Sequence, residues 1–143
     1  MVCLFETIPG CTSIFPALYQ YHFMGPVVLR LGLAIVFFIH GYQKLFGGIE
    51  PTTQFFASVG IHPARFFAYF VGLVEFVGAV FLFVGLFVQL VALLLAIVMA
   101  VAIWRVKYSR GFIGGYDLEL MLLMMALSLT LLGPGAYALD MPF

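Results

Sequence analysis

Ionisable side chains stand at the end of an apolar run in the stretch FFIHGYQKLFGG, residues 37–48. His40 and Lys44 are four residues apart, so on a helix they share one face. Glu75 lies within a second apolar run, GLVEFVGAVFLFVGL. An imidazole, an ammonium and a carboxylate can donate and accept hydrogen bonds and move protons. These residue types predict a polar pocket in an apolar setting. The elements that position these side chains determine which of them can act together.

The composition of the chain indicates the kind of element. Of its 143 residues, 65% are hydrophobic, 17% are aromatic and only 8% are charged. Soluble domains are about half apolar, so we expect this chain in the cell membrane, with the lipid bilayer as its first partner. The formal net charge of zero argues against a nucleic-acid partner, because nucleic acids bind basic surfaces.

Four apolar runs are long enough to cross a bilayer, which takes roughly 20 residues. The first covers residues 27–46 and follows Pro26, two more fill residues 63–104 with a tight hairpin at GLFVQL, and the fourth runs from about 116 to LLGPG. Between the first two, GGIEPTTQFFASVGIHPAR predicts a short amphipathic helix at the membrane surface. The predicted fold is all-α: an integral membrane four-helix transmembrane bundle with a short interfacial helix between helices 1 and 2.

Residues 1–25 precede the spans and are predicted to form an N-terminal leader at the membrane interface, so that residues 26–140 make up the transmembrane domain. The leader has no Lys or Arg and no clean apolar core before a cleavage site, unlike a secretory signal. Both cysteines, Cys3 and Cys11, lie in it. We interpret them as two thiols, with a disulfide after export as the alternative.

Depth in the bilayer brings the polar residues together. At about 1.5 Å per residue, Lys44 lies roughly 3 Å, His40 roughly 9 Å and Glu75 roughly 14 Å from the loop ends of their spans. Asp117 and Glu119 enter the fourth span from the same side. The candidate polar pocket therefore consists of His40, Lys44, Glu75, Asp117 and Glu119.

Each of these residues also has a purely structural interpretation. Lys44 can reach the headgroups from a helix end, His40 can be a core histidine that bonds one carbonyl, and Asp117 and Glu119 suit the first turn of a helix. Glu75 would be costly facing lipid, so we expect it to face the bundle interior and to pair with His40 or Lys44.

Small residues are placed where they allow these helices to pack closely. Gly72 and Gly78 flank Glu75 along its span, and Gly41 follows His40 directly. Glycine lets two membrane helices approach each other at short distance. Gly41, Gly72 and Gly78 are therefore predicted helix-packing positions.

No cofactor motif is evident. A buried haem b needs two facing histidines, whereas His22 and His62 lie outside the spans. A metal held by His40 and the two glutamates is possible in ligand type, but no diagnostic spacing supports it and no metal is assigned. The motifs GxGxxG and GxxxxGK[ST] do not occur. Hydrogen bonding and proton delivery remain, for example from His40 or Lys44 to a quinone carbonyl.

Several spaced stretches carry a family resemblance. They are LRLGLAIVFFIHGYQKLFGG, FFASVGI, GLVEFVGAVFLFVGL, VALLLAIVMAVAI and GGYDLELMLL followed by LLGPGAYALD, and together they cover about residues 27–140. In this order they resemble the DoxX family of small four-helix membrane proteins. The resemblance falls on His40-Gly41, Lys44, Glu75, Asp117 or Glu119, and Gly133-Pro134-Gly135.

The resemblance implies a membrane subunit associated with quinol oxidase or thiosulfate:quinone oxidoreductase systems, or with thiol-redox and oxidative-stress assemblies. We predict a subunit of a quinone-linked redox complex, with no self-sufficient active site, no covalently bound cofactor, and a pocket that holds a quinone or a lipid. The alternative is a non-catalytic accessory subunit of a larger respiratory or photosynthetic-type membrane complex. A transporter is disfavoured, since no inverted repeat or broken helix is apparent.

The charges of the loops predict an orientation. An even number of spans puts both termini on one side. The basic residues gather on the other side, at Lys44, Arg65, Arg105, Lys107 and Arg110. The side of the termini has only Arg30, interpreted as a headgroup anchor. The positive-inside rule then predicts exoplasmic termini. Family members often carry basic residues near the termini and the hairpin turn, which implies the reverse, but this turn has Gln89 and the chain ends in MPF.

Maleimide labelling of intact cells tests this topology. We expect an impermeant maleimide to label Cys3 but not a cysteine introduced by Gly114→Cys, because the loop before the fourth span is predicted to face the cytoplasm. Labelling of Gly114→Cys without Cys3 would overturn the orientation. Labelling of both Gly114→Cys and Val88→Cys would show that the hairpin is misplaced.

Overall fold

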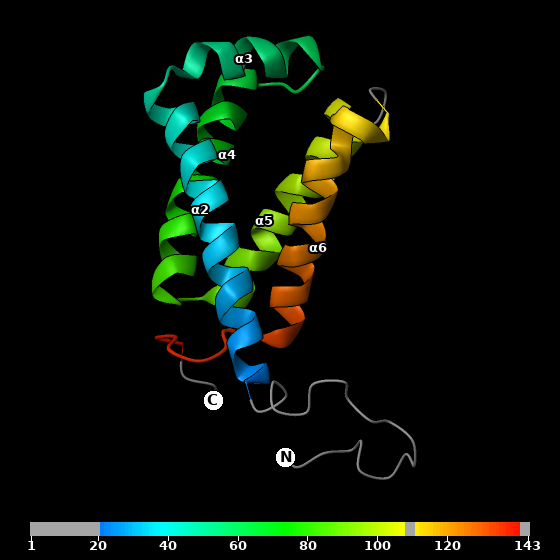
Figure 1. Ribbon diagram of the computed structural model, residues 1–143. Helices are drawn as coiled ribbons and strands as arrows, with labels where there is room; N and C mark the ends of the chain where they lie inside the picture. The colour runs from blue at the N-terminus through cyan, green and yellow to red at the C-terminus, as the bar shows by residue number, and fades with distance from the viewer. Residues whose placement is uncertain (1–20, 108–110, 141–143) are drawn as a thin grey trace.

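The structure, a computed structural model, describes residues 21–107 and 111–140. The regular structure within these residues consists of helices (Figure 1). The elements are η1 (His22–Met24), α2 (Gly25–Phe46), α3 (Ile49–Ser58), α4 (Ala64–Val84), α5 (Val88–Ala102), the π-helical turns η2 (Ile103–Lys107) and η4 (Phe112–Tyr116), and α6 (Asp117–Leu132). Within these residues, four helices with their flanking turns are long and apolar enough to cross a membrane. The predicted four-helix fold is confirmed, whereas Cys3, Cys11 and most of the leader lie outside the described residues.

The helix ends follow local chemistry. Pro26 stands in the first turn of α2, where its missing N–H costs nothing. Gly85 ends α4 in the left-handed region at φ 77°, which glycine adopts without a Cβ penalty. Its N–H donates to the Phe81 carbonyl over 2.8 Å. Helix α5 begins at Val88, so the hairpin predicted at GLFVQL is a tight turn, as expected.

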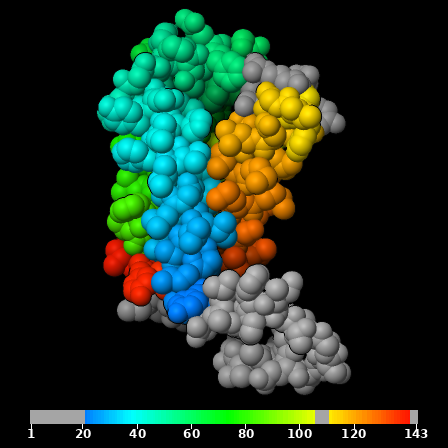
Figure 2. Space-filling view, in the orientation of Figure 1, coloured from blue at the N-terminus to red at the C-terminus, as the bar shows by residue number. Residues whose placement is uncertain are grey.

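The four long helices form two pairs. Helix α2 packs most extensively on α4, and α5 packs on α6, while the contacts of α4 with α5 and of α2 with α6 join the pairs. The pairs converge at the end where the described chain begins and finishes and separate toward α3, which lies across the other end (Figure 1). Figure 2 shows α2 and α6 side by side on one face.

The apolar core fills the end where the pairs converge. Leu33 of α2, Leu82 of α4, Leu95 of α5 and Leu129 of α6 are each 0% exposed. Small residues such as Ala126, also 0% exposed, fit between them. The core therefore joins all four helices on the side of the Gly85 turn and leaves the α3 end to other contacts.

Helices α2 and α4 approach each other closely at Gly41. A Cβ atom on Gly41 would lie 2.5 Å from the Phe76 backbone nitrogen and 2.8 Å from its Cα. A Cβ on Gly72 would lie 3.0 Å from a methyl carbon of Leu45 in the same interface, whereas one on Gly78 would meet Val91 of α5 at 3.1 Å. Gly41 thus sets the spacing of the first helix pair.

The segment after α6 is tied to the bundle by two charged residues. Arg30, 3% exposed, donates from Nη1 to the Pro134 carbonyl over 3.0 Å and from Nη2 to the Tyr137 carbonyl over 3.3 Å. Its interpretation as a headgroup anchor is therefore wrong. Asp140 accepts the N–H groups of Phe87 and Val88 at 2.8 and 2.6 Å, which satisfies the first turn of α5.

Gly41→Ala should destabilise the protein, because the new methyl group would overlap the α4 backbone, which cannot rotate away. We expect a loss of about 1–3 kcal/mol, the usual range for overpacking, measured as a fall in the thermal unfolding midpoint in detergent. Gly32→Ala in the same helix is the matched control, since its Cβ would meet only the flexible Met125 Cε at 3.5 Å. Equal midpoints for the two variants would contradict the close approach.

Candidate functional site

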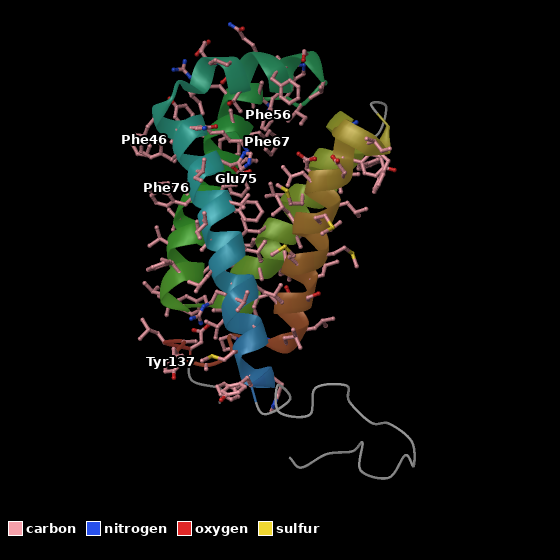
Figure 3. The ribbon with its side chains drawn as sticks, viewed as in Figure 1. Phe46, Phe56, Phe67, Glu75, Phe76 and Tyr137 are labelled. Carbon is pink, nitrogen blue, oxygen red and sulfur yellow. The ribbon has the colours of Figure 1, made fainter. Side chains whose placement is uncertain are left out.

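A cavity of about 830 Å³ lies between the helix pairs at the α3 end of the bundle. Ligand sites in proteins typically enclose about 300–1,000 Å³. Its walls are largely apolar and aromatic, with contributions from Phe37, Phe55, Phe56, Phe67, Phe70, Val71, Ile97 and Leu122. In Figure 3, Phe56 and Phe67 lie beneath α3 next to Glu75. All four spanning helices and the interfacial helix thus enclose a space that an aromatic or amphiphilic molecule would fit.

The structure places four of the five predicted polar residues on this cavity. His40, Lys44, Glu75 and Glu119 line it. Asp117 is not among the lining residues: its Oδ2 accepts a hydrogen bond from the Gly114 N–H at 3.3 Å, in the turn that leads into α6. Asp117 therefore has a local contact that stabilises the start of its helix, in line with its structural interpretation.

Lys44 and Glu75 form an ion pair across the α2–α4 interface. Lys44 Nζ lies 2.5 Å from Glu75 Oε1, and the two side chains are 25% and 1% exposed. Glu75 Oε2 is buried and has no hydrogen-bond partner among the described residues. Gly72, one turn before Glu75, lies against the Lys44 side chain and leaves room for it. In the described part of the chain, the pair places the Lys44 ammonium group and a carboxylate with one unpaired oxygen, Glu75 Oε2, at the cavity wall.

His40 lies one turn before Lys44 on α2. It is exposed and lines the cavity. A neutral imidazole has one donor and one acceptor nitrogen. Its position makes His40 a second hydrogen-bonding group for a molecule in the cavity, about one helical turn deeper than Lys44.

Two further polar residues that the sequence did not single out as site residues, His62 and Arg105, also line the cavity. His62 lies in the short connection between α3 and α4, and Arg105 lies in the π-helical turn η2 with its guanidinium 5.6 Å from the Trp104 ring centre. His62 lies just outside a span and Arg105 is the last residue of one. Both are at the loop end where the other polar residues gather, and this position was the signal that the sequence offered. In the described part of the chain, no group of three or more His, Cys, Asp and Glu residues could hold a metal ion.

A separate cluster of aromatic rings covers the outer side of α2 and α4. Phe76 lies 5.0 Å from Phe38 and 5.6 Å from Phe46 between ring centres, and Tyr42 lies 5.0 Å from Phe46. In Figure 3, Phe46 and Phe76 project away from the side on which Glu75 lies. The first helix pair therefore has a polar inner face on the cavity and an aromatic outer face.

The fold defines a class: a multi-pass α-helical membrane protein with a largely apolar cavity, lined by a few polar side chains, at one end of the bundle. Residues 25–108 match the DoxX family, and the chain belongs to that family, as its motifs indicated. A relative from Bacillus subtilis (strain 168), named "Putative oxidoreductase CatD", is 38% identical over 120 residues, which cover 84% of this chain and 87% of the relative. No solved structure gives a significant match.

The ion pair should appear as coupling between two substitutions. Glu75→Leu leaves the Lys44 ammonium unpaired in an apolar setting, so we expect a loss of about 3 kcal/mol or more in the free energy of unfolding. Lys44→Met added to it should restore part of that loss. The measurement is a double-mutant cycle of thermal stability in detergent.

Glu50→Gln, at an exposed position of α3, serves as the control with an expected effect near zero. Strictly additive effects of the Glu75 and Lys44 substitutions would mean that the two side chains do not interact.

Proposed function

We propose that this protein is the membrane subunit of a quinone-linked redox complex and that its cavity holds the quinone ring. Membership of the DoxX family and a relative named as an oxidoreductase support the redox assignment. The observation that carries the proposal is the cavity itself, about 830 Å³ in volume, in which hydrogen-bonding groups stand at the wall of an otherwise aromatic and aliphatic space.

The cavity matches the chemistry of a quinone. A quinone ring is flat and apolar on its faces and has two carbonyl oxygens that accept hydrogen bonds. Phe67 and Phe70 supply aromatic wall, and His40 and Lys44 supply donors to a carbonyl oxygen. An isoprenoid tail would extend between the helix pairs toward lipid. The polar groups orient the ring and the apolar walls hold it, the usual division in small-molecule sites.

Electron transfer requires a partner. Reduction of a quinone to a quinol takes two electrons and two protons, and the sequence contains no dinucleotide-binding loop and only two cysteines. A larger membrane complex would therefore supply the electron carrier, while this chain binds the ring. The alternative is a non-catalytic accessory subunit. It would also belong to a larger membrane complex but would bind no quinone, and its cavity would hold lipid or serve only in helix packing.

Quinone binding can be measured through Trp104, the only tryptophan of the chain. It neighbours the cavity-lining Arg105, and a quinone quenches indole fluorescence at short range. We expect a short-tailed quinone to quench Trp104 fluorescence saturably in nanodiscs. His40→Leu should raise the dissociation constant about five- to tenfold, because one hydrogen bond to the quinone is lost.

His22→Leu, at the opposite end of the bundle, is the control and should bind as the unaltered protein does. Quenching that does not saturate, or that is the same in both variants, would contradict a quinone site at His40. Purified protein that reduces a quinone alone would contradict the need for a partner.

A further inference from the structure

Glu75 has one carboxylate oxygen that its ion pair does not use. Lys44 binds Oε1, whereas Oε2 is buried without a hydrogen-bond partner among the described residues. An ionised carboxylate only accepts hydrogen bonds. Buried polar groups are almost always paired, so an acceptor left over at a cavity wall indicates a donor that the protein itself does not provide.

Lys44 places a donor beside that acceptor. Its ammonium has three N–H donors, of which one is committed to Glu75 Oε1. The side chain is 25% exposed and lines the cavity. A ligand at this point therefore meets a donor and an acceptor side by side, and a hydroxyl group, which donates once and accepts twice, matches both.

We propose that the Lys44–Glu75 pair makes the cavity selective for a ring that carries a hydroxyl group, so that the reduced hydroquinone binds more tightly than the quinone. This inference rests on the proposed function. A quinone carbonyl can accept from Lys44 but leaves Glu75 Oε2 unpaired, whereas a hydroquinone hydroxyl accepts from Lys44 and donates to Oε2. A site built to bond a hydroxyl rejects the analogue that lacks it.

The other polar groups on the cavity do not remove this distinction. His40, His62 and Arg105 line it and can donate to either redox form of the ring; a neutral histidine also offers one acceptor nitrogen, but Glu75→Gln leaves both histidines in place and so separates their effect from that of Glu75. Glu119 is the other carboxylate on the wall, contributed by α6 from across the cavity. Glu75 is therefore the specificity-determining residue in this proposal, and Glu119 is the competing candidate that the experiment must separate from it.

A ligand series that includes two ethers of the hydroquinone tests the proposal on the unaltered protein. The probes are a short-tailed benzohydroquinone, its monomethyl ether, its dimethyl ether and the corresponding quinone, titrated anaerobically into the full-length protein in nanodiscs by calorimetry. We expect the hydroquinone and the monomethyl ether, which retain a hydroxyl donor, to bind at least tenfold more tightly than the quinone and the dimethyl ether.

Glu75→Gln tests whether Glu75 itself causes the preference for hydroquinone. The amide oxygen can still accept from Lys44, but the other position now carries an NH2 donor in place of an acceptor. We expect the variant to lose the preference for hydroquinone and to bind the quinone at least as tightly. Glu50→Gln, on the exposed face of α3 and outside the cavity, is the control and should keep the preference.

The outcomes are distinguishable. Equal affinity of the unaltered protein for hydroquinone and quinone would overturn this inference and leave the proposed function standing. Binding of neither would overturn the proposed function itself. Loss of the preference in Glu119→Gln but not in Glu75→Gln would assign the acceptor to α6 and overturn the role of Glu75. If Glu75→Gln does not fold, the ether series on the unaltered protein tests the preference for a hydroxyl group, and retention of that preference in Glu119→Gln assigns the acceptor to Glu75 rather than to α6.

Discussion

The ion pair between Lys44 and Glu75 is the interaction on which the arrangement of this protein depends. A carboxylate that is 1% exposed in the middle of a spanning helix is stable only beside a cation. The pair joins α2 and α4, which approach each other closely at Gly41, where no Cβ stands against the Phe76 backbone. The ion pair thus fixes how α2 and α4 face each other at the cavity wall, while Gly41 sets their spacing.

The two ends of the bundle differ in how their side chains pack. Where the pairs converge, leucines and small residues pack without polar atoms, and Arg30 and Asp140 bind the backbone of the segment after α6 and of the hairpin turn. Toward α3 the pairs separate and the cavity opens. The apolar core is concentrated at one end, whereas the polar and aromatic side chains at the other end line the cavity.

Most of the fold was predictable because bilayer thickness restricts a spanning helix to a narrow range of lengths. Pro26 and Gly85 mark helix ends by backbone geometry, and counting depth placed His40, Lys44 and Glu75 in the same half of the bilayer. Arg30 was misinterpreted, since its partners are carbonyl groups about a hundred residues away, and such contacts leave no periodic signal. His62 and Arg105 were missed because they lie outside a span or at its last residue, and their place on the cavity follows from the fold.

The short connection between α4 and α5 has a mechanical consequence. Only Gly85, Leu86 and Phe87 separate these helices, and the two helix pairs diverge from the end at which this turn lies (Figure 1). The level of Lys44 lies roughly 21 Å along α2 from that of Arg30, at about 1.5 Å per residue. Over that length, a difference of a few degrees in the angle between the helix pairs corresponds to a displacement of about an ångström at the α3 end. The angle between the helix pairs at this end therefore sets the width of the cavity, although Gly85, Leu86 and Phe87 do not line it.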